Sequence, residues 1–468
     1  MTQRREQAGS YLRQFWRMNR NARLYLLSNT FSSITVGIFA LLYNLYLVAL
    51  GYQADFIGLL LVVGAIGGAL GMLMTGPLIG HWGEKAVLFW SSVVAAIAGT
   101  LQLLIPVTGS LLITSFVFGV AGGIYLVIGA PLLAGGSQES SRSHIFSLNA
   151  SLALVTTVIG QALGGYLPDL VSLPAIIHSG LLQLISPLLV SGAQARSYEL
   201  ALLLAGLIAA PSFIPILMMD PTPPARQHPA VALALPALPL FPRLLQQLQE
   251  MLRAWPRERV IRMTMALLRG PIGRLAIVEG LIGLGAGLFI PYFNLYFVDH
   301  LGISTAFYGL ITAISTLLMA LATLVGPFFA ARLGKVRGTV IAHLASLPFL
   351  VTLGFAHALP LVLAAYLVRW SLMNMADPVL LSFFMGVVKP EERATANSAY
   401  NLSFYGFWAI GGALGGQIIA AGNYTLPFGL AATLYLAAAL LLWRFFGHTQ
   451  ELSPSSPEAQ RERASVIP

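Results

Sequence analysis

Three ionisable side chains, Glu279, Arg369 and Asp377, lie inside long apolar stretches of the chain. A charged group in hydrocarbon is costly, so such residues usually face a water-filled cavity or an oppositely charged partner. Arg369 and Asp377 share one stretch and are eight residues apart, about 12 Å along a helix, which is too far for a direct bond. We therefore predict that Glu279 and Asp377 exchange a proton, while Arg369 binds an anionic group or neutralises a carboxylate.

Each of these roles has a structural alternative. Glu279 lies about 8 Å from the nearer end of its predicted helix, where it could pair with Arg274. Asp377 could equally form a structural pair with a neighbouring helix. Pro378 lacks a backbone N–H and should loosen the helix beside Asp377, which would free a carbonyl for substrate or a proton. Asn374, on the same stretch, is a further candidate substrate ligand.

Two asparagines occupy matching places in two similar stretches of sequence. Asn44 and Asn294 are each followed by Leu-Tyr. Their amides could bind substrate from two sides, or they could form hydrogen bonds between neighbouring helices. Tyr125 is a candidate wall residue for the same substrate, and ordinary packing is its alternative.

The composition places the chain in a membrane. Of its 468 residues, 57% are hydrophobic and only 9% are charged, whereas a soluble domain carries roughly 25% charged residues. The net charge of +9 is explained by basic loops on one side of a bilayer, so we expect no nucleic-acid partner. There are no cysteines, which excludes disulfides and thiolate chemistry. No histidine pair has metal-ligand spacing and no phosphate loop or nucleophile motif occurs, so we expect no metal, no cofactor and no enzyme activity.

Apolar runs between charged, proline or glycine breaks predict twelve membrane spans. They lie at 23–50, 54–79, 86–106, 110–134, 144–167, 198–219, 275–298, 304–329, 338–357, 359–386, 394–421 and 424–446. With the N-terminus inside the cell, every Lys and Arg except Arg196 and Arg369 falls on the cytoplasmic side. This bias predicts that both termini are cytoplasmic.

The spans divide the chain into five parts. Residues 1–22 and 447–468 are predicted as cytoplasmic tails, and 23–219 and 274–446 as two bundles of six helices each. Residues 220–273 are predicted as a cytoplasmic linker that contains an amphipathic helix lying along the membrane. Residues 168–197 carry an apolar segment interrupted by prolines, which we interpret as an extracytoplasmic insertion.

The two bundles are copies of one unit. Residues 37–48 read GIFALLYNLYLV and residues 287–298 read GLFIPYFNLYFV, with six of twelve positions identical. The string GQALGG at 160–165 also returns as GGALGG at 411–416, 251 residues later. Because the offset holds across separate segments, the sequence predicts two fused copies of one membrane unit. The stretches 37–48 and 287–298 are 250 residues apart, and by that offset the counterpart of Glu279 is Asn29, so only the second copy carries ionisable chemistry there.

The loops after the second and eighth spans read GPLIGHWGEK at 76–85 and GPFFAARLGKVR at 326–337. This pair resembles the glycine-rich cytoplasmic-loop signature of the major facilitator superfamily of secondary transporters. The resemblance covers roughly residues 22–446, and it implies an all-α membrane protein of twelve helices in two pseudo-symmetric six-helix bundles. It implies a gating loop formed by Gly76, Gly83, Glu84, Lys85, Gly334 and Lys335. The chain departs from the family pattern at Gly80, where members usually carry an aspartate.

The string GQALGG resembles a degenerate form of a signature found in antiporters of the same family. Its alternative role is a face of small residues that lets two helices pack closely. Because the string returns in span 11, we favour packing.

The resemblance also implies a transport mechanism. Spans 1, 4, 7 and 10 would line a central cavity, and one bundle would rock against the other to give alternating access. The walls are sparsely polar, which favours proton-coupled export of small amphipathic compounds by a monomer in the plasma membrane. Two alternatives stay open: uptake of a small, possibly anionic, nutrient, and lipid movement by a flippase or scramblase.

Overall fold

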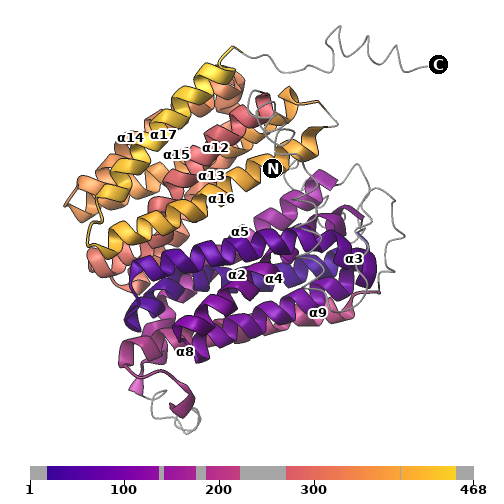
Figure 1. Cartoon of the computed structure of the whole chain (residues 1–468), viewed down its shortest axis with the longest axis vertical. Coiled ribbons are helices and arrows are strands. Elements are labelled where there is room, and N and C mark those ends of the chain that lie inside the picture. The colour runs from indigo at the N-terminus through magenta and orange to yellow at the C-terminus, as the bar shows by residue number, and fades with distance from the viewer. Residues whose placement is uncertain (1–17, 136–141, 175–185, 222–269, 390–391, 449–468) are drawn as a thin grey trace, which may run out of the picture. The chain divides into compact units, whose positions relative to one another are not determined.

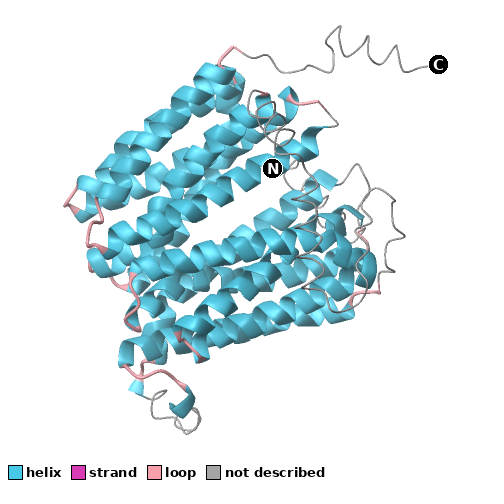
Figure 2. Ribbon diagram, in the orientation of Figure 1, coloured by secondary structure: helices cyan, strands magenta, loops and turns pink. Residues whose placement is uncertain are grey.

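The computed structural model describes residues 18–135, 142–174, 186–221, 270–389 and 392–448. The described part of the chain is almost entirely helical and contains no strand (Figure 2). It divides into two compact units (Figure 1). The first unit takes its described residues from Met1–Leu233 and Pro291–Leu317, and the second takes them from Ala234–Ile290 and Leu318–Pro468.

The first repeat supplies most helices of the first unit. They are α2 (Arg20–Ala49), α3 (Ala54–Leu104), α4 (Thr108–Gly135), α5 (Arg142–Val171), α8 (Ala193–Ala209) and α9 (Phe213–Met218). A short 3₁₀ turn, η3 (Ala210–Ser212), joins α8 to α9, and η2 (Ser186–Leu188) precedes them. The Asn19 side chain caps α2 by accepting a 2.8 Å hydrogen bond from the backbone N–H of Ala22.

The second repeat begins with α12 (Pro271–Phe289), the 3₁₀ turn η5 (Ile290–Tyr292) and the π-helical turn η6 (Leu295–His300). It continues with α13 (Thr305–Leu333), α14 (Lys335–Phe355), α15 (Leu359–Val387), α16 (Arg393–Ala420) and α17 (Leu426–Phe446). The unit division falls within span 7, between Ile290 and Pro291, and within α13.

These helices confirm the predicted fold class. Eleven helices in the described residues are long and apolar enough to cross a membrane, and the 51-residue α3 is long enough to cross it twice. The predicted spans 2 and 3 are thus joined in one element, which turns at Gly83. There φ is 77° and ψ is 161°, a conformation that is essentially restricted to glycine.

Span 7 differs from its prediction. The sequence predicts one helix over 275–298, whereas the α-helix ends at Phe289 and is followed by the 3₁₀ and π-helical turns. Pro291 explains the break, because proline has no N–H to donate to the preceding helical turn.

Three other predictions fall largely outside the described residues. These are the amphipathic helix of the 220–273 linker, most of both tails, and the middle of the 168–197 insertion. At the start of that insertion α5 extends to Val171, a few residues beyond its predicted end.

Glycines bring paired helices into backbone contact within each unit. A Cβ on Gly160 of α5 would lie 2.0 Å from the carbonyl oxygen of Ile34 on α2. A Cβ on Gly411 of α16 would lie 2.2 Å from the carbonyl oxygen of Leu284 on α12. The glycines of GQALGG and GGALGG therefore lie at helix contacts, which confirms the packing interpretation.

Candidate functional site

A buried carboxyl group lies between α12 and α16 of the second unit. Glu279 is only 3% exposed, and the Tyr400 side chain lies beside it, near enough to interact with its carboxyl group. The helix contact fixes this pairing: Gly283 packs on the backbone of Phe404, and Glu279 and Tyr400 each lie one turn earlier. Asp377 on α15 is close enough for its charge to act on both Glu279 and Tyr400.

The structural alternative for Glu279, an ion pair with Arg274, does not form between these described residues. The Arg274 guanidinium instead stacks over the ring of Phe445, with 5.6 Å between Cζ and the ring centroid. Within the described parts of the chain, the structure has one ion pair, and it joins Arg20 to Asp220. Glu279 therefore has a phenol and no described cation as its neighbour.

Asp377 differs from Glu279 in exposure. Its side chain is exposed, and α15 continues through Pro378 without a break. Pro378 has no N–H for the carbonyl of Asn374 four residues earlier, so that carbonyl lacks its usual helical donor. The Asn374 amide itself donates a 2.8 Å hydrogen bond to the Trp370 carbonyl of its own helix.

The first unit has a neutral cluster at the place equivalent to the acidic one. The Asn29 Nδ2 donates a 2.9 Å hydrogen bond to the Asn149 Oδ1, and the Tyr125 hydroxyl donates to the Asn29 Oδ1 at 3.3 Å. The repeat offsets of 250 and 251 residues relate Asn29 to Glu279 and Asn149 to Tyr400. All three side chains of this cluster are half-buried.

Sequence reasoning missed Asn149 and Tyr400. The offset of 251 that relates GQALGG to GGALGG would have paired them, because both lie eleven residues before these strings. Both helix pairs also repeat their contact: a Cβ on Gly37 would meet the Thr157 carbonyl at 2.4 Å. A Cβ on Gly287 would lie 2.1 Å from the carbonyl oxygen of Trp408.

Arg369 is buried in an aromatic setting in the second unit. Its side chain is 1% exposed, and its Nη2 donates a 3.1 Å hydrogen bond to the Tyr435 hydroxyl. Its Cζ lies 4.7 Å from the ring centroid of Phe289, a distance at which the π face stabilises the cation. Its Nε and the buried Nε2 of His343 have no hydrogen-bond partner among the described residues. Arg369 thus has no contact with a described carboxylate, and its side chain is buried in this conformation.

Asn44 and Asn294 both form hydrogen bonds between helices. The Asn44 Nδ2 donates to the Pro291 carbonyl at 2.7 Å, and the Asn294 Nδ2 donates to the Leu41 carbonyl at 3.1 Å. All four residues belong to the first unit. The structure thus shows these two amides in hydrogen bonds between helices. Substrate binding by them stays a prediction.

The predicted gating loops share a backbone feature. Gly83 has φ 77° and Gly334 has φ 84°, and both are followed by a lysine within two residues. Lys335 donates a 3.2 Å hydrogen bond to the Ser382 hydroxyl on α15. Gly76 borders open space, since a Cβ there would meet no atom within 4 Å. Glu84 is half-buried, directly before Lys85.

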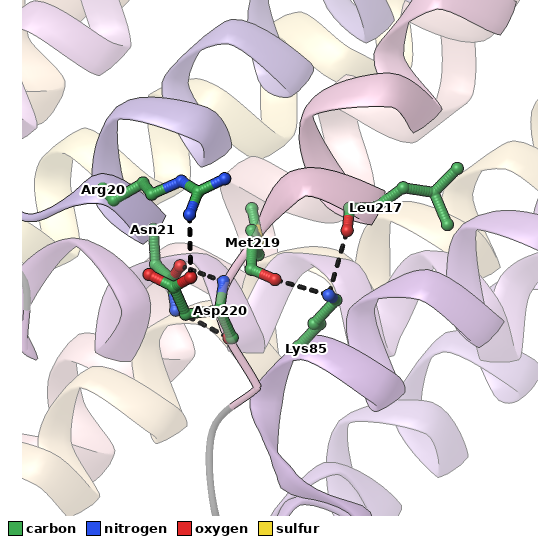
Figure 3. Close-up of polar contacts among 6 residues, drawn as sticks. All are labelled: Arg20, Asn21, Lys85, Leu217, Met219 and Asp220. Atoms are coloured by element: carbon green, nitrogen blue, oxygen red, sulfur yellow. Dashed lines mark hydrogen bonds and ion pairs between the residues drawn. The ribbon is translucent and has the colours of Figure 1, made fainter.

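Lys85 joins the loop to the end of α9 in the first unit (Figure 3). Its Nζ donates to the carbonyls of Leu217, at 2.9 Å, and Met219. Asp220, directly after, accepts a 3.0 Å bond from Arg20 and exchanges two hydrogen bonds with Asn21. The start of α2, the turn of α3 at Gly83 and the end of α9 are thereby held together by polar contacts.

The sequence profile of the Major Facilitator Superfamily matches residues 25–270 and 275–468. The chain belongs to this superfamily. The match covers both repeats, so it agrees with the internal duplication and with the glycine-rich loops. No curated protein matches this superfamily member by sequence.

Solved structures of transporters share the fold. The nucleoside transporter NupG is 16% identical, with a TM-score of 0.64 over 92% of this chain and 99% of its own. A bacterial homolog of the human lysosomal transporter Spinster is 13% identical, with a TM-score of 0.68 over 93% and 98%. A D-xylose-proton symporter is 15% identical, with a TM-score of 0.63 over 92% and 98%. At these identities the likeness shows the fold alone.

The structure brings only some of the predicted site residues of this superfamily member together. Glu279 and Asp377 are close in the second unit, whereas Arg369 lies in a separate aromatic cluster. In the first unit Tyr125 contacts Asn29, and Asn44 and Asn294 contact the backbone. The chain is therefore a multi-pass membrane transporter with one acidic and one neutral polar cluster at equivalent places.

Proposed function

We propose that this superfamily member is a proton-coupled exporter of small amphipathic compounds in the plasma membrane. The observation that carries the proposal is the Glu279 carboxyl, buried beside Tyr400 and without a described cation. The transporter would work as a monomer in the bilayer, with both termini cytoplasmic and an ion gradient as its energy source.

Burial makes Glu279 suitable as a proton carrier. An ionised carboxylate without a cation is costly in a low-dielectric environment, whereas the protonated carboxyl is tolerated. A cycle that exposes Glu279 alternately to the two sides of the membrane would let it bind a proton on one side and release it on the other. Tyr400, beside the carboxyl, would donate a hydrogen bond to it during the cycle, and the exposed Asp377 would pass the proton to and from water. The proton that Glu279 binds on the outer side is released to the cytoplasm, and this downhill movement of the proton drives the substrate outward.

Two observations support an amphipathic substrate. The described polar side chains at the candidate site are few, and a sugar-like solute would need many fixed hydrogen-bond partners. Arg369 is 1% exposed and contacts Tyr435 and Phe289, so it offers no accessible cation to an anionic nutrient in this conformation. Anion binding by Arg369 would require another conformation.

The test measures accumulation of ethidium and a rhodamine dye in bacteria that lack their own efflux pumps. Cells expressing the parent protein should accumulate several-fold less dye than empty-vector cells, and an uncoupler should abolish the difference. Glu279→Gln and Asp377→Asn keep the side-chain shapes but carry no exchangeable carboxyl proton, so both should restore dye accumulation. Glu392→Gln, which neutralises an exposed carboxylate before α16, is the matched control and should behave as the parent.

Two results would contradict this proposal. Dye levels equal to those of empty vector, with the protein shown to be in the membrane, would remove the exporter function. Export that survives in the Glu279→Gln, Asp377→Asn double variant and still responds to the uncoupler would remove the proposed proton carriers.

A second candidate function is proton-linked uptake of a small neutral solute. The Asn29, Asn149 and Tyr125 cluster favours it, because half-buried amides and a phenol can recognise a hydroxyl or amide group. Uptake of labelled D-xylose and uridine by cells expressing the parent and Asn149→Ala would test it. Uptake above that of empty vector, lost in Asn149→Ala, would favour this function, and uptake equal to that of empty vector would reject these solutes.

A further inference from the structure

The hydrogen bonds of Asn44 and Asn294 are related by the internal repeat. Asn44 corresponds to Asn294 and Leu41 corresponds to Pro291, all at an offset of 250 residues. Asn44 donates to the carbonyl of Pro291, and Asn294 donates to the carbonyl of Leu41. The two donors correspond to each other in the repeat, and so do the two acceptors. The two bonds therefore form one symmetric pair, in which the same contact is made twice.

The break in span 7 makes the Pro291 carbonyl available for this pair. In a continuous α-helix, the Leu295 N–H would donate to the carbonyl of Pro291. Here the Leu295 N–H donates instead to the Asn294 Oδ1 at 3.0 Å, and the π-helical turn begins at Leu295. Asn294 thus uses both atoms of its amide: Oδ1 caps its own turn, and Nδ2 reaches Leu41.

The pair lies toward the extracytoplasmic side in the predicted orientation. Asn44 precedes the end of α2 at Ala49 by about one turn, and Asn294 is 2% exposed between η5 and η6. Span 1 and span 7 both run outward, so these are their outer halves. Asn44 and Asn294 therefore join two spans near the side at which a substrate would leave or enter.

A second contact of the first unit closes the same side. A Cβ on Gly309 of α13 would lie 2.6 Å from the Gln161 carbonyl of α5, so these two helices touch through their backbones. The Thr316 hydroxyl donates a 3.0 Å hydrogen bond to the Gln161 Oε1. In the predicted orientation, span 5 ends and span 8 begins on the extracytoplasmic side. The outer part of the second repeat, 291–317, thus packs on spans 1 and 5 of the first repeat inside one compact unit.

We propose that Asn44 and Asn294 form a symmetric hydrogen-bonded gate that holds the extracytoplasmic side of the first unit closed. Opening that side breaks both bonds, and closing it restores both together. Because the acceptors are backbone carbonyls, only the two amide donors need to be present in the sequence. The stretches around them, YNLYLV and FNLYFV, keep the donors at matching places in both repeats.

The test uses the absence of cysteine from the natural chain. Thr305→Cys places one thiol at a residue that is 8% exposed, beside Gly165 of α5. A membrane-impermeant maleimide, added to the outside of intact cells, then reports how often this side opens. In the otherwise unchanged protein labelling should be slow. Asn44→Ala and Asn294→Ala should each speed it several-fold, and the double variant about tenfold or more, since two buried hydrogen bonds are lost.

Asn401→Ala is the matched control. Its amide donates to the Asn397 carbonyl of its own helix, α16, so its loss breaks no contact between helices. Labelling in this control should equal that of the Thr305→Cys parent. Purified variants should elute as single species, and should the double variant not fold, the two single variants carry the test.

Labelling rates in folded single and double variants that equal the parent rate would overturn the gate. A faster rate in Asn44→Ala alone, with Asn294→Ala unchanged, would overturn its symmetry. The measurement uses no transported compound, so its result is independent of the proposed export function.

Discussion

At the residue scale, the two units differ in one pair of side chains at equivalent places. A carboxyl and a phenol, Glu279 and Tyr400, occupy in the second unit the places that Asn29 and Asn149 occupy in the first. The glycine contacts beside both pairs are the same, so the scaffold is shared and the chemistry is changed. This difference is why the proposed proton exchange is placed in the second unit.

Tyr400→Phe should weaken proton coupling without removing it. The variant keeps the ring and deletes the hydroxyl beside Glu279, so the proposed carboxyl loses its neighbouring hydrogen-bond donor. We expect dye export against a gradient to fall severalfold, less than in Glu279→Gln. Tyr405→Phe, at a 52% exposed position on the same helix, should export as the parent does. Equal export by Tyr400→Phe and the parent would show that the hydroxyl has no part in coupling.

Tyr435→Phe should destabilise the second unit. It removes the hydroxyl that accepts from the fully buried Arg369, and no other described residue takes that place. A buried charged donor left without its partner costs about 1–3 kcal/mol. The melting temperature of the detergent-purified protein should therefore fall. Adding Arg369→Met should recover part of the loss, because the buried charge is then also removed. A double variant less stable than Tyr435→Phe would contradict this account.

At the element scale, glycine positions decide which helices pair. On α16, Gly411 faces the backbone of α12, whereas a Cβ on Gly406 would meet nothing within 4 Å. Both glycines lie on one helix, so they have similar helix propensity and differ in their contacts. The sequence shows that α16 contains several glycines, but it does not show which of these glycines contacts a neighbouring helix.

Gly411→Ala should therefore be far more damaging than Gly406→Ala. A Cβ at Gly411 would lie 2.2 Å from the Leu284 carbonyl, so α12 and α16 would have to move apart. Overpacking of this kind costs about 1–3 kcal/mol or more. The separation would also move Glu279 from Tyr400. Thermal unfolding and dye export should both be impaired in Gly411→Ala and near normal in Gly406→Ala, and equal behaviour of the two would refute the packing role.

Gly83→Ala tests the turn within α3 in the same way. At Gly83 φ is 77° and ψ is 161°, a region that costs a residue with a Cβ about 1–3 kcal/mol. We expect a lower melting temperature and slower transport, because Lys85 would be displaced from the Leu217 and Met219 carbonyls. Gly76→Ala, where a Cβ meets nothing within 4 Å, is the control that should leave both quantities unchanged.

At the scale of the whole molecule, apolar periodicity and the repeat predict the twelve spans and the family well. Spans are long and uniform, so their limits follow from hydropathy. Span 7 was predicted as one helix although Pro291 signals its break. The hydrogen bond from the Leu295 N–H to the Asn294 Oδ1 could not be predicted, because the sequence does not place this side chain. The burial of Arg369 was also not predicted, since its partners Phe289 and Tyr435 come from two other helices. Contacts between distant segments are what a single sequence lacks.

The duplication also predicts how coupling can be removed while transport is kept. Glu279→Asn with Tyr400→Asn gives the second unit the neutral pair that Asn29 and Asn149 form in the first, so the helix contact should survive. We expect a folded transporter that moves dye down its gradient but no longer exports it against one. In vesicles with an internal pH indicator, dye movement should no longer change the internal pH. The single variant Asn29→Gln, which keeps an amide in the first unit, should still couple the two movements. Proton-linked export by the double variant would show that the coupling carboxyl lies elsewhere, with Asp377 next to be tested.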